Sequence, residues 1–363
     1  MVHTERDLAA ALNEARSMPA GRAKCERLDE VIRLADAAGL DAFAFNARLD
    51  AMGDYVRAGQ TQRKLLAMAM CLATLERSPE VVTPWQHQRL LRLLVYAPMN
   101  LVRFPAVART QIEQVFDDAE RHLRSSGYRM HAIYQLRMYV ALHLGDHDAA
   151  LSWHDRFLVA EPDRMSSCNA CVPSYLIECY EETGQFARAV ELTEKSKHLT
   201  CHGQPSWLLS HALLPYVRTG DLDGAREAQR RAYPGMRDAN WLHGIGLHLV
   251  YFGLTGNEVR GLELVERHLP WLDGSPSPFQ TMEFASGAVM VLRGLAETGH
   301  GGAVVRDGRR GGDPETTVGA LCDELAAIAN DLAGRFDARN GNDHFRRRLA
   351  ARSVPASGDD PRD

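Results

Sequence analysis

Apolar residues recur at spacings of three and four along most of this chain, in segments that end at a glycine. Four of these segments stand in register, and their closing glycines lie 36 to 39 residues apart: Gly145, Gly184, Gly220 and Gly256. Spacing by three and four marks one face of an α-helix, and glycine adopts the left-handed conformation that commonly ends a helix. The pattern therefore predicts a helix that closes at each glycine.

A second apolar period follows each glycine after a short polar turn, as at Ala149, Ala150, Trp153 and Phe157. The predicted unit is a pair of antiparallel helices, which cannot cover its own apolar face and must stack on a neighbour. Weaker copies run over residues 54–79 and 85–116. In the second of these copies Asn100 replaces glycine as the expected left-handed cap. With one or two helices in residues 5–38, we expect six or seven hairpins.

These hairpins resemble the tetratricopeptide repeat, a helix-turn-helix of roughly 34 residues with glycine in the middle, alanine in the second helix and proline at the close. Residues 146–162 match this pattern best. Four further segments resemble uncharacterised actinobacterial proteins of the same type: residues 167–173, 199–201, 254–261 and 336–341. The resemblance implies an all-α fold, a right-handed α-solenoid of stacked antiparallel hairpins, and brings no established activity.

Changes in pattern divide the predicted continuous solenoid into five parts. These are N-terminal hairpins (1–128), regular repeats with the cysteine cluster (129–298), a flexible glycine-rich loop (299–317), capping helices (318–351) and a disordered tail (352–363). The loop is dense in glycine and polar residues. A helical period resumes at Val318 and suits the open end of a stack. We attribute the basic cluster Arg346–Arg348 with Arg352 to a helix C-terminus, which favours cations.

Composition narrows the class of protein. The 363 residues are 45% hydrophobic and 25% charged, which fits a folded protein with a sizeable core. A net charge of −5 gives no electrostatic case for nucleic-acid binding. We see neither a signal peptide nor an apolar run of membrane-spanning length and expect a cytoplasmic protein with no membrane partner.

One group of residues has the spacing of a metal site. Cys168 and Cys171 form a C-x2-C turn, and Cys201 follows thirty residues later with His202 beside it. Cys171 and Cys201 both precede a proline that suits the first turn of a repeat's opening helix. Equivalent positions in stacked repeats lie about 10 Å apart between helix axes, so the three thiols can reach one ion. Thiolates at this spacing are typical of Zn²⁺ ligands.

The fourth ligand stays open in the sequence. His202 is our choice, while His198, a water or a carboxylate would also serve. A closed site would fasten two hairpins together, and this structural zinc is the prediction. An open fourth position would instead let zinc activate water.

No other residues predict catalysis. Cys25, Cys71, Cys179 and Cys322 each fall inside an apolar helical period, where thiols usually pack as small core residues. The chain has no phosphate-binding loop, no H-E-x-x-H and no G-x-S-x-G. We therefore name no catalytic residue.

The first functional hypothesis is a scaffold, adaptor or regulatory module that binds a peptide or protein in a solenoid groove, because opening helices line the concave face of such folds. The candidate partner-binding residues on them are Tyr175, Trp207, His211, His243 and His248. Each could instead pack in the core. Within the resemblance, His248, Asn257, Arg260 and Glu283 recur, either as a polar groove or as hydrogen bonds between repeats.

The second hypothesis is a zinc-dependent enzyme or small-molecule-responsive regulator with an open metal site. It requires a general base beside the metal, which the sequence does not place.

Overall fold

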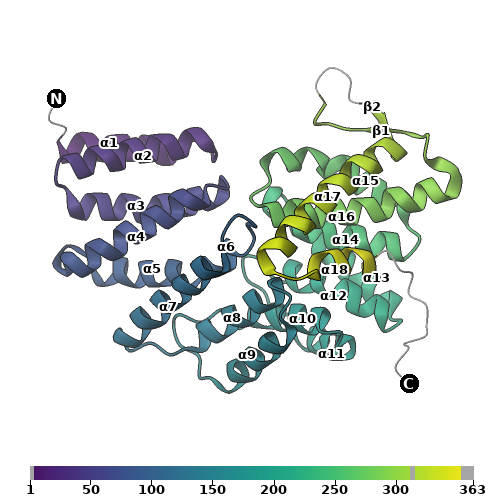
Figure 1. Cartoon of the computed structure of the whole chain (residues 1–363), viewed down its shortest axis with the longest axis horizontal. Coiled ribbons are helices and arrows are strands. Elements are labelled where there is room, and N and C mark those ends of the chain that lie inside the picture. The colour runs from purple at the N-terminus through teal and green to yellow at the C-terminus, as the bar shows by residue number, and fades with distance from the viewer. Residues whose placement is uncertain (1–3, 311–314, 353–363) are drawn as a thin grey trace. The chain divides into compact units, whose positions relative to one another are not determined.

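A computed structural model describes residues 4–310 and 315–352 of the chain (Figure 1). These residues form 18 α-helices, a few short 3-10 or π turns and one two-stranded sheet. The predicted all-α class is confirmed. The chain divides into two compact units, and α7 (Arg109–Ser125) begins in one and continues in the other.

Unit 1 contains the chain up to Leu101 together with residues 113–128. Its first six helices are α1 (Glu5–Ser17), α2 (Arg22–Ala37), α3 (Asp41–Arg57), α4 (Thr61–Arg77), α5 (Pro84–Val95) and α6 (Ala97–Leu101). Helices that follow one another in sequence pack together from α1 to α5. The predicted left-handed cap at Asn100 is wrong, since Asn100 lies inside α6 and no described non-glycine residue has a positive φ.

Unit 2 contains residues 102–112 and the chain from Arg129 onward. Its helices in full are α8 (His131–His143), α9 (His147–Val159), α10 (Val172–Glu182), α11 (Phe186–Ser196), α12 (Ser206–Arg218), α13 (Leu222–Ala232), α14 (Leu242–Leu254), α15 (Glu258–His268), α16 (Pro278–Leu295), α17 (Val318–Asn340) and α18 (His344–Arg352). Each even-numbered helix from α8 to α14 packs against the odd-numbered helix that follows it. The even-numbered helices from α8 to α16 also contact one another in sequence order.

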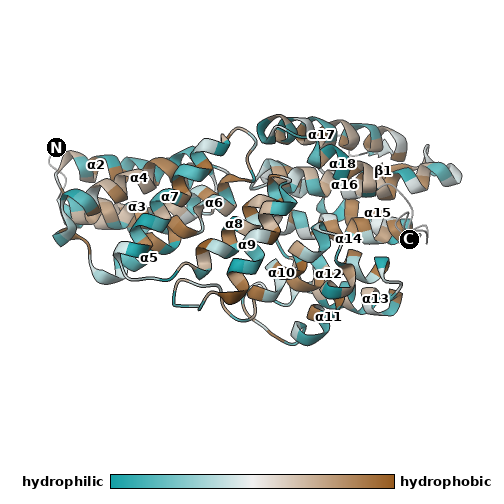
Figure 2. Cartoon of the chain, turned by 60° about the horizontal axis from the view of Figure 1, so that its bottom comes forward, coloured by the Kyte–Doolittle hydropathy of each residue, from teal (hydrophilic) through white to brown (hydrophobic). Residues whose placement is uncertain are grey.

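The four glycines in register end α8, α10, α12 and α14 as predicted. Their φ angles are 73°, 72°, 78° and 66°, which glycine tolerates because it has no Cβ. Apolar and hydrophilic residues are interspersed along the helices in Figure 2. Helices α13 and α15 bury one face each, whereas α8 and α14 are buried almost all round. The main core of unit 2 runs continuously from α8 to α17, and the repeat pattern thus places one apolar face after another.

The backbones of α14 and α16 approach closely at two glycines. A Cβ on Gly246 would lie 2.5 Å from the carbonyl oxygen of Glu283, and a Cβ on Gly287 would lie 2.5 Å from the carbonyl oxygen of Gly246. Side chains larger than hydrogen are excluded at this crossing. The close contact fixes the position of Glu283 relative to α14. Glu283 belongs to the ionic network described in the next section.

The glycine-rich segment 299–317 contains a short antiparallel hairpin of β1 (Val304–Arg306) and β2 (Glu315–Thr317) rather than loop alone. Val305 is buried against the core. Residues 311–314 of this predicted loop lie outside the described residues. After it, α17 begins at Val318 and buries the predicted apolar face.

The C-terminal tail predicted from residue 352 differs at its first residue. Arg352 belongs to α18 and is buried. The rest of the predicted tail, 353–363, lies outside the described residues. None of the described helices combines the length and the apolar character needed to cross a bilayer.

Candidate metal centre and pocket

The three predicted cysteines lie together. The sulfur atoms of Cys168, Cys171 and Cys201 are all within 4.8 Å of one another, and those of Cys171 and Cys201 are 3.3 Å apart. Cys171 is the N-cap of α10, and Cys201 lies in the turn before α12. A zinc tetrahedron with bonds of about 2.3 Å places its sulfurs about 3.8 Å apart, so the group fits a metal ion.

The local backbone prepares this group. The amides of Cys171 and Val172 both donate to the carbonyl of Cys168, closing a tight turn. Burial opposes ionisation of Cys168, but hydrogen bonds from Cys171 and nearby amides outweigh it and lower the pKa of the Cys168 thiol. Burial and hydrogen bonds to the other two thiols raise the pKa of Cys171 to about 12. The pKa values of Cys168 and Cys171 are therefore shifted in opposite directions within one cluster.

The ring nitrogens of His202 do not join the three sulfurs within the same radius. His202 as the fourth ligand stays a prediction, and so does His198. The sulfurs are also partly open, because Cys168 and Cys201 are exposed. A fourth ligand could thus come from a neighbouring side chain that moves or from solvent.

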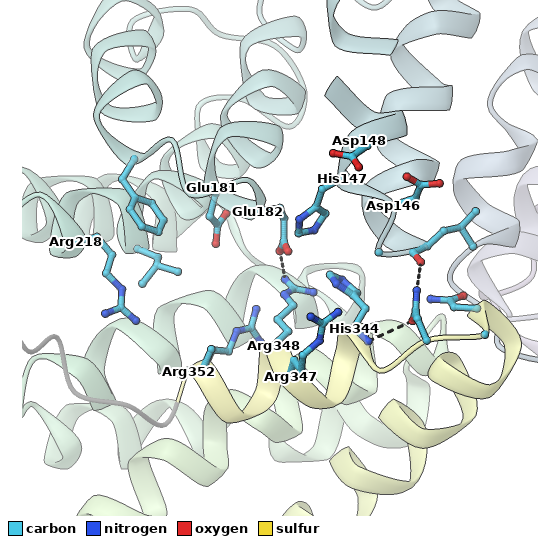
Figure 3. Close-up of a pocket in the computed structure, with 18 of the residues that line it drawn as sticks. Asp146, His147, Asp148, Glu181, Glu182, Arg218, His344, Arg347, Arg348 and Arg352 are labelled. Carbon is cyan, nitrogen blue, oxygen red and sulfur yellow. Dashed lines mark hydrogen bonds and ion pairs between the residues drawn. The ribbon is translucent and has the colours of Figure 1, made fainter. Parts of the chain in front are cut away.

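A pocket of about 700 Å³ lies elsewhere in unit 2 (Figure 3). The turn before α9, the first turn of α9 and the end of α10 supply acidic residues on one side: Asp146, Asp148, Glu181 and Glu182. Helix α18 supplies arginines on the opposite side, Arg347, Arg348 and Arg352. Phe186, Leu214 and Arg218 complete one end. The volume is typical of a small-molecule or side-chain site, and the lining carries both signs of charge.

The floor of this pocket is a buried ionic network. Arg348 lies 2.8 Å from Glu182 and 3.1 Å from Glu283, and Arg352 lies 2.8 Å from Glu283. Burial opposes the charge on Glu283, but Arg348 and Arg352 outweigh it and lower the pKa of that carboxyl group. Burial also opposes the charge on Arg348, yet the surrounding glutamates raise its pKa. Two guanidinium groups and two carboxylates therefore hold α18 against α10 and α16.

Three of the five predicted partner-binding residues are buried in unit 2. His211 is 4% exposed, His243 2% and His248 0%. His211 contacts Glu181 at 3.1 Å, and the attraction of Glu178 and Glu181 raises its pKa against the opposing effect of burial. His243 shows the reverse balance, because burial lowers its pKa. A partner could reach these rings only after α18 or the surrounding helices had moved.

Tyr175 and Trp207 are half-buried and so remain partly accessible. Trp207 stacks on Trp241 with ring centroids 4.9 Å apart and also contacts His211 and His243. The Trp207–Trp241 pair thus extends from the buried histidines toward the surface. It offers a flat apolar face of the kind found in protein interfaces.

Sequence reasoning missed a second group of metal-ligand donors, inside the pocket. One donor atom each of His147, Glu182 and His344 lies within 4.8 Å of the others. The residues are 35 and 162 positions apart, so no motif spacing links them. One feature of the sequence could have linked two of these residues. His147 and Glu182 each flank a predicted repeat turn, and the turns of successive repeats lie close together when the repeats stack.

The recurring polar positions of the resemblance separate in the structure. Glu283 is a centre of the ionic network, and His248 accepts or donates a hydrogen bond with Ser210 at 3.3 Å. Asn257 is the N-cap of α15, and with Arg260 it lines a small second pocket. The sequence led us to attribute Arg348 and Arg352 to the C-terminus of a helix. Their main partners are instead the buried carboxylates.

No family model matches this chain, and no curated protein matches it significantly. The functional argument therefore rests on the chemistry of the cysteine group and the pocket.

Proposed function

We propose that this protein is a regulatory or scaffold module of stacked helical hairpins, a right-handed α-solenoid of the tetratricopeptide type, that binds a peptide segment of a partner protein. The supporting observations are the hairpins closed by glycine at a regular period and the contacts of each even-numbered helix with its successors. Folds of this kind have concave surfaces that accept peptides.

The observation that carries the proposal is the state of Arg218 at the pocket. No hydrogen bond or ion pair joins the side chain of Arg218 to another residue that the structure describes, whereas Arg348 and Arg352 are both paired with carboxylates. Phe186 and Leu214 line the pocket beside it. An unpaired guanidinium next to apolar carbons suits a peptide with an acidic group and an adjacent hydrophobic side chain.

Peptide selection tests this function directly. A random phage-displayed peptide library is selected on the full chain, and the enriched peptides are synthesised and titrated calorimetrically. We expect acidic peptides whose affinity falls at least tenfold in Arg218→Ala, with the melting temperature unchanged. Arg226→Ala is the matched control, because this exposed arginine pairs with Asp223 on the surface of α13. Failure to enrich any peptide, or equal binding by Arg218→Ala, would overturn the proposal.

We further propose that Cys168, Cys171 and Cys201 hold a structural zinc ion that fastens the start of α10 to the start of α12. Metal bound only by the folded state adds directly to stability. The purified chain should carry zinc that Cys171→Ser loses, and a chelator should lower the melting temperature of the wild type. The half-buried Cys322, outside the cluster, provides the control Cys322→Ser. An unchanged melting curve after zinc removal would contradict a structural role.

The alternative of a zinc-dependent enzyme or small-molecule-responsive regulator at the cysteines needs a cavity beside them. None of the three cysteines lines the 700 Å³ pocket, which is why we place the ligand in the pocket and give the cysteine metal a structural part.

A further inference from the structure

We propose that His147, Glu182 and His344 form a second metal site, one that binds a zinc-class divalent ion with an open coordination position facing the pocket. The site goes beyond the peptide-binding function and stands without it. Two imidazoles and one carboxylate are a donor set found in zinc sites that keep a place for water or a ligand.

The three donors come from three separate elements that meet at one point (Figure 3). His147 is the first residue of α9, Glu182 is the last residue of α10, and His344 is the first residue of α18. Their donor atoms lie within 4.8 Å of one another. Donors about 2.0 to 2.2 Å from a common tetrahedral ion are separated by about 3.3 to 3.6 Å, so small side-chain adjustments suffice.

The backbone around His344 holds this arrangement in place. Asn342 donates to the carbonyl of Leu144 at 2.8 Å, and Asn340 donates to the carbonyl of His143 at 3.1 Å. A Cβ on Gly145 would lie only 2.5 Å from the Cβ of His344. The turn that precedes His147 and the start of α18 are therefore in direct contact, and the two histidines need no large movement to share an ion.

Helix α18 is also fixed at its first turn. The carboxylate of Asp337 accepts hydrogen bonds from the amides of Phe345 and Arg346, at 2.8 and 3.1 Å. Such capping satisfies amides that have no partner within the helix. His344 is thus presented from a rigid helix start, as a metal ligand requires.

An independent observation points to a missing partner. The Nε2 atom of His147 is buried and has no hydrogen-bond partner among the residues that the structure describes. A buried ring nitrogen without a partner destabilises the folded state, so such atoms are rare in native structures. Imidazole binds zinc through either ring nitrogen, Nε2 or Nδ1, so an ion between the three side chains would satisfy this Nε2.

The charges around the site allow a cation. Arg348 contacts one oxygen of Glu182 at 2.8 Å, which orients the carboxylate, and a carboxylate has lone pairs enough for a guanidinium and a metal together. Arg347 adds a second positive charge nearby, while Asp146, Asp148 and Glu181 line the same pocket with negative charge. Two neutral imidazoles and one carboxylate would leave a bound divalent ion with a net positive charge. Its open position would then attract an anionic oxygen of a ligand.

Cobalt binding tests the site in the full chain. The metal-free protein is titrated with Co²⁺, and calorimetry gives the number of ions while absorption spectra separate sulfur-bound from nitrogen- and oxygen-bound cobalt. We expect an ion without thiolate-to-cobalt charge transfer in the wild type. His147→Ala should lose this ion or bind it at least tenfold more weakly, and Glu182→Gln should do the same with both histidines retained.

The control is His300→Ala, because His300 is exposed and lies outside the group. It should keep the stoichiometry and affinity of the wild type. Equal binding of sulfur-free cobalt by the wild type, His147→Ala and Glu182→Gln, or no such binding at all, would overturn the proposal. A variant that loses only the thiolate-bound ion and keeps the sulfur-free ion would also overturn the proposal. Peptide titrations without metal test the peptide function separately.

Discussion

Replacing Glu283 by glutamine should release the C-terminal helix from the rest of unit 2. Glu283 is 1% exposed, and its carboxylate accepts hydrogen bonds from Arg348 at 3.1 and 3.4 Å and from Arg352 at 2.8 Å. Arg348 would keep Glu182 as a partner. Among the described residues, Arg352 would keep Ser286, at 3.1 Å, and the neutral amide oxygen of the new side chain as acceptors, and would become a buried charge without a counter-charge.

The magnitude follows from this difference. Breaking a buried ion pair by removing one partner costs about 3 to 5 kcal/mol. We therefore expect Glu283→Gln to lower the free energy of unfolding by about that amount. Glu182→Gln should cost less, about 1 to 2 kcal/mol, because Arg348 still pairs with Glu283 and the Glu182 side chain is 13% exposed.

Urea unfolding followed by circular dichroism measures these changes, since urea does not screen charges as guanidinium does. Hydrogen exchange then locates the change, and amides of α18 should lose protection in Glu283→Gln before those of α14. Glu297→Gln is the control at an exposed glutamate after α16, with an expected effect within about 0.5 kcal/mol. A Glu283→Gln variant as stable as this control, with α18 still protected, would refute the reasoning.

Two further predictions concern backbone contact and pH. Gly145→Ala should destabilise by about 2 to 3 kcal/mol in urea unfolding, and Gly184→Ala by about 1 kcal/mol. Both glycines are left-handed, at 73° and 72°, but only the Cβ on Gly145 would meet another residue, His344; equal losses would deny that contact. Burial lowers the pKa of His268 from 6.5 to about 4. The contribution of neutral His268 to the free energy of unfolding is complete above its unfolded pKa. It is lost as the pH falls from about 6.5 toward 4, by about 2 kcal/mol between pH 7 and pH 5, because the unfolded state binds the proton first. His268→Gln should flatten this part of the stability curve, and an unchanged slope would contradict it.

The local pattern of the sequence was sufficient for the helices and their ends. Spacing by three and four set the buried face of α17, and glycine at a regular period set the ends of α8, α10, α12 and α14. Both depend on short-range sterics and on one helix face at a time. The gathering of Cys168, Cys171 and Cys201 was also predictable, because equivalent positions in successive hairpins become neighbours when the hairpins stack.

Tertiary structure alone decided the pocket. Helix α18 returns to residues far earlier in the chain, so that Arg348 meets Glu182 and His344 meets His147. No periodicity encodes such contacts, since they join segments more than 150 residues apart and depend on where the last helix docks. The sequence determined which residues are helical and where each helix ends. The packing of α18 determined which of their charged side chains form a site, because burial forces arginines and glutamates to pair.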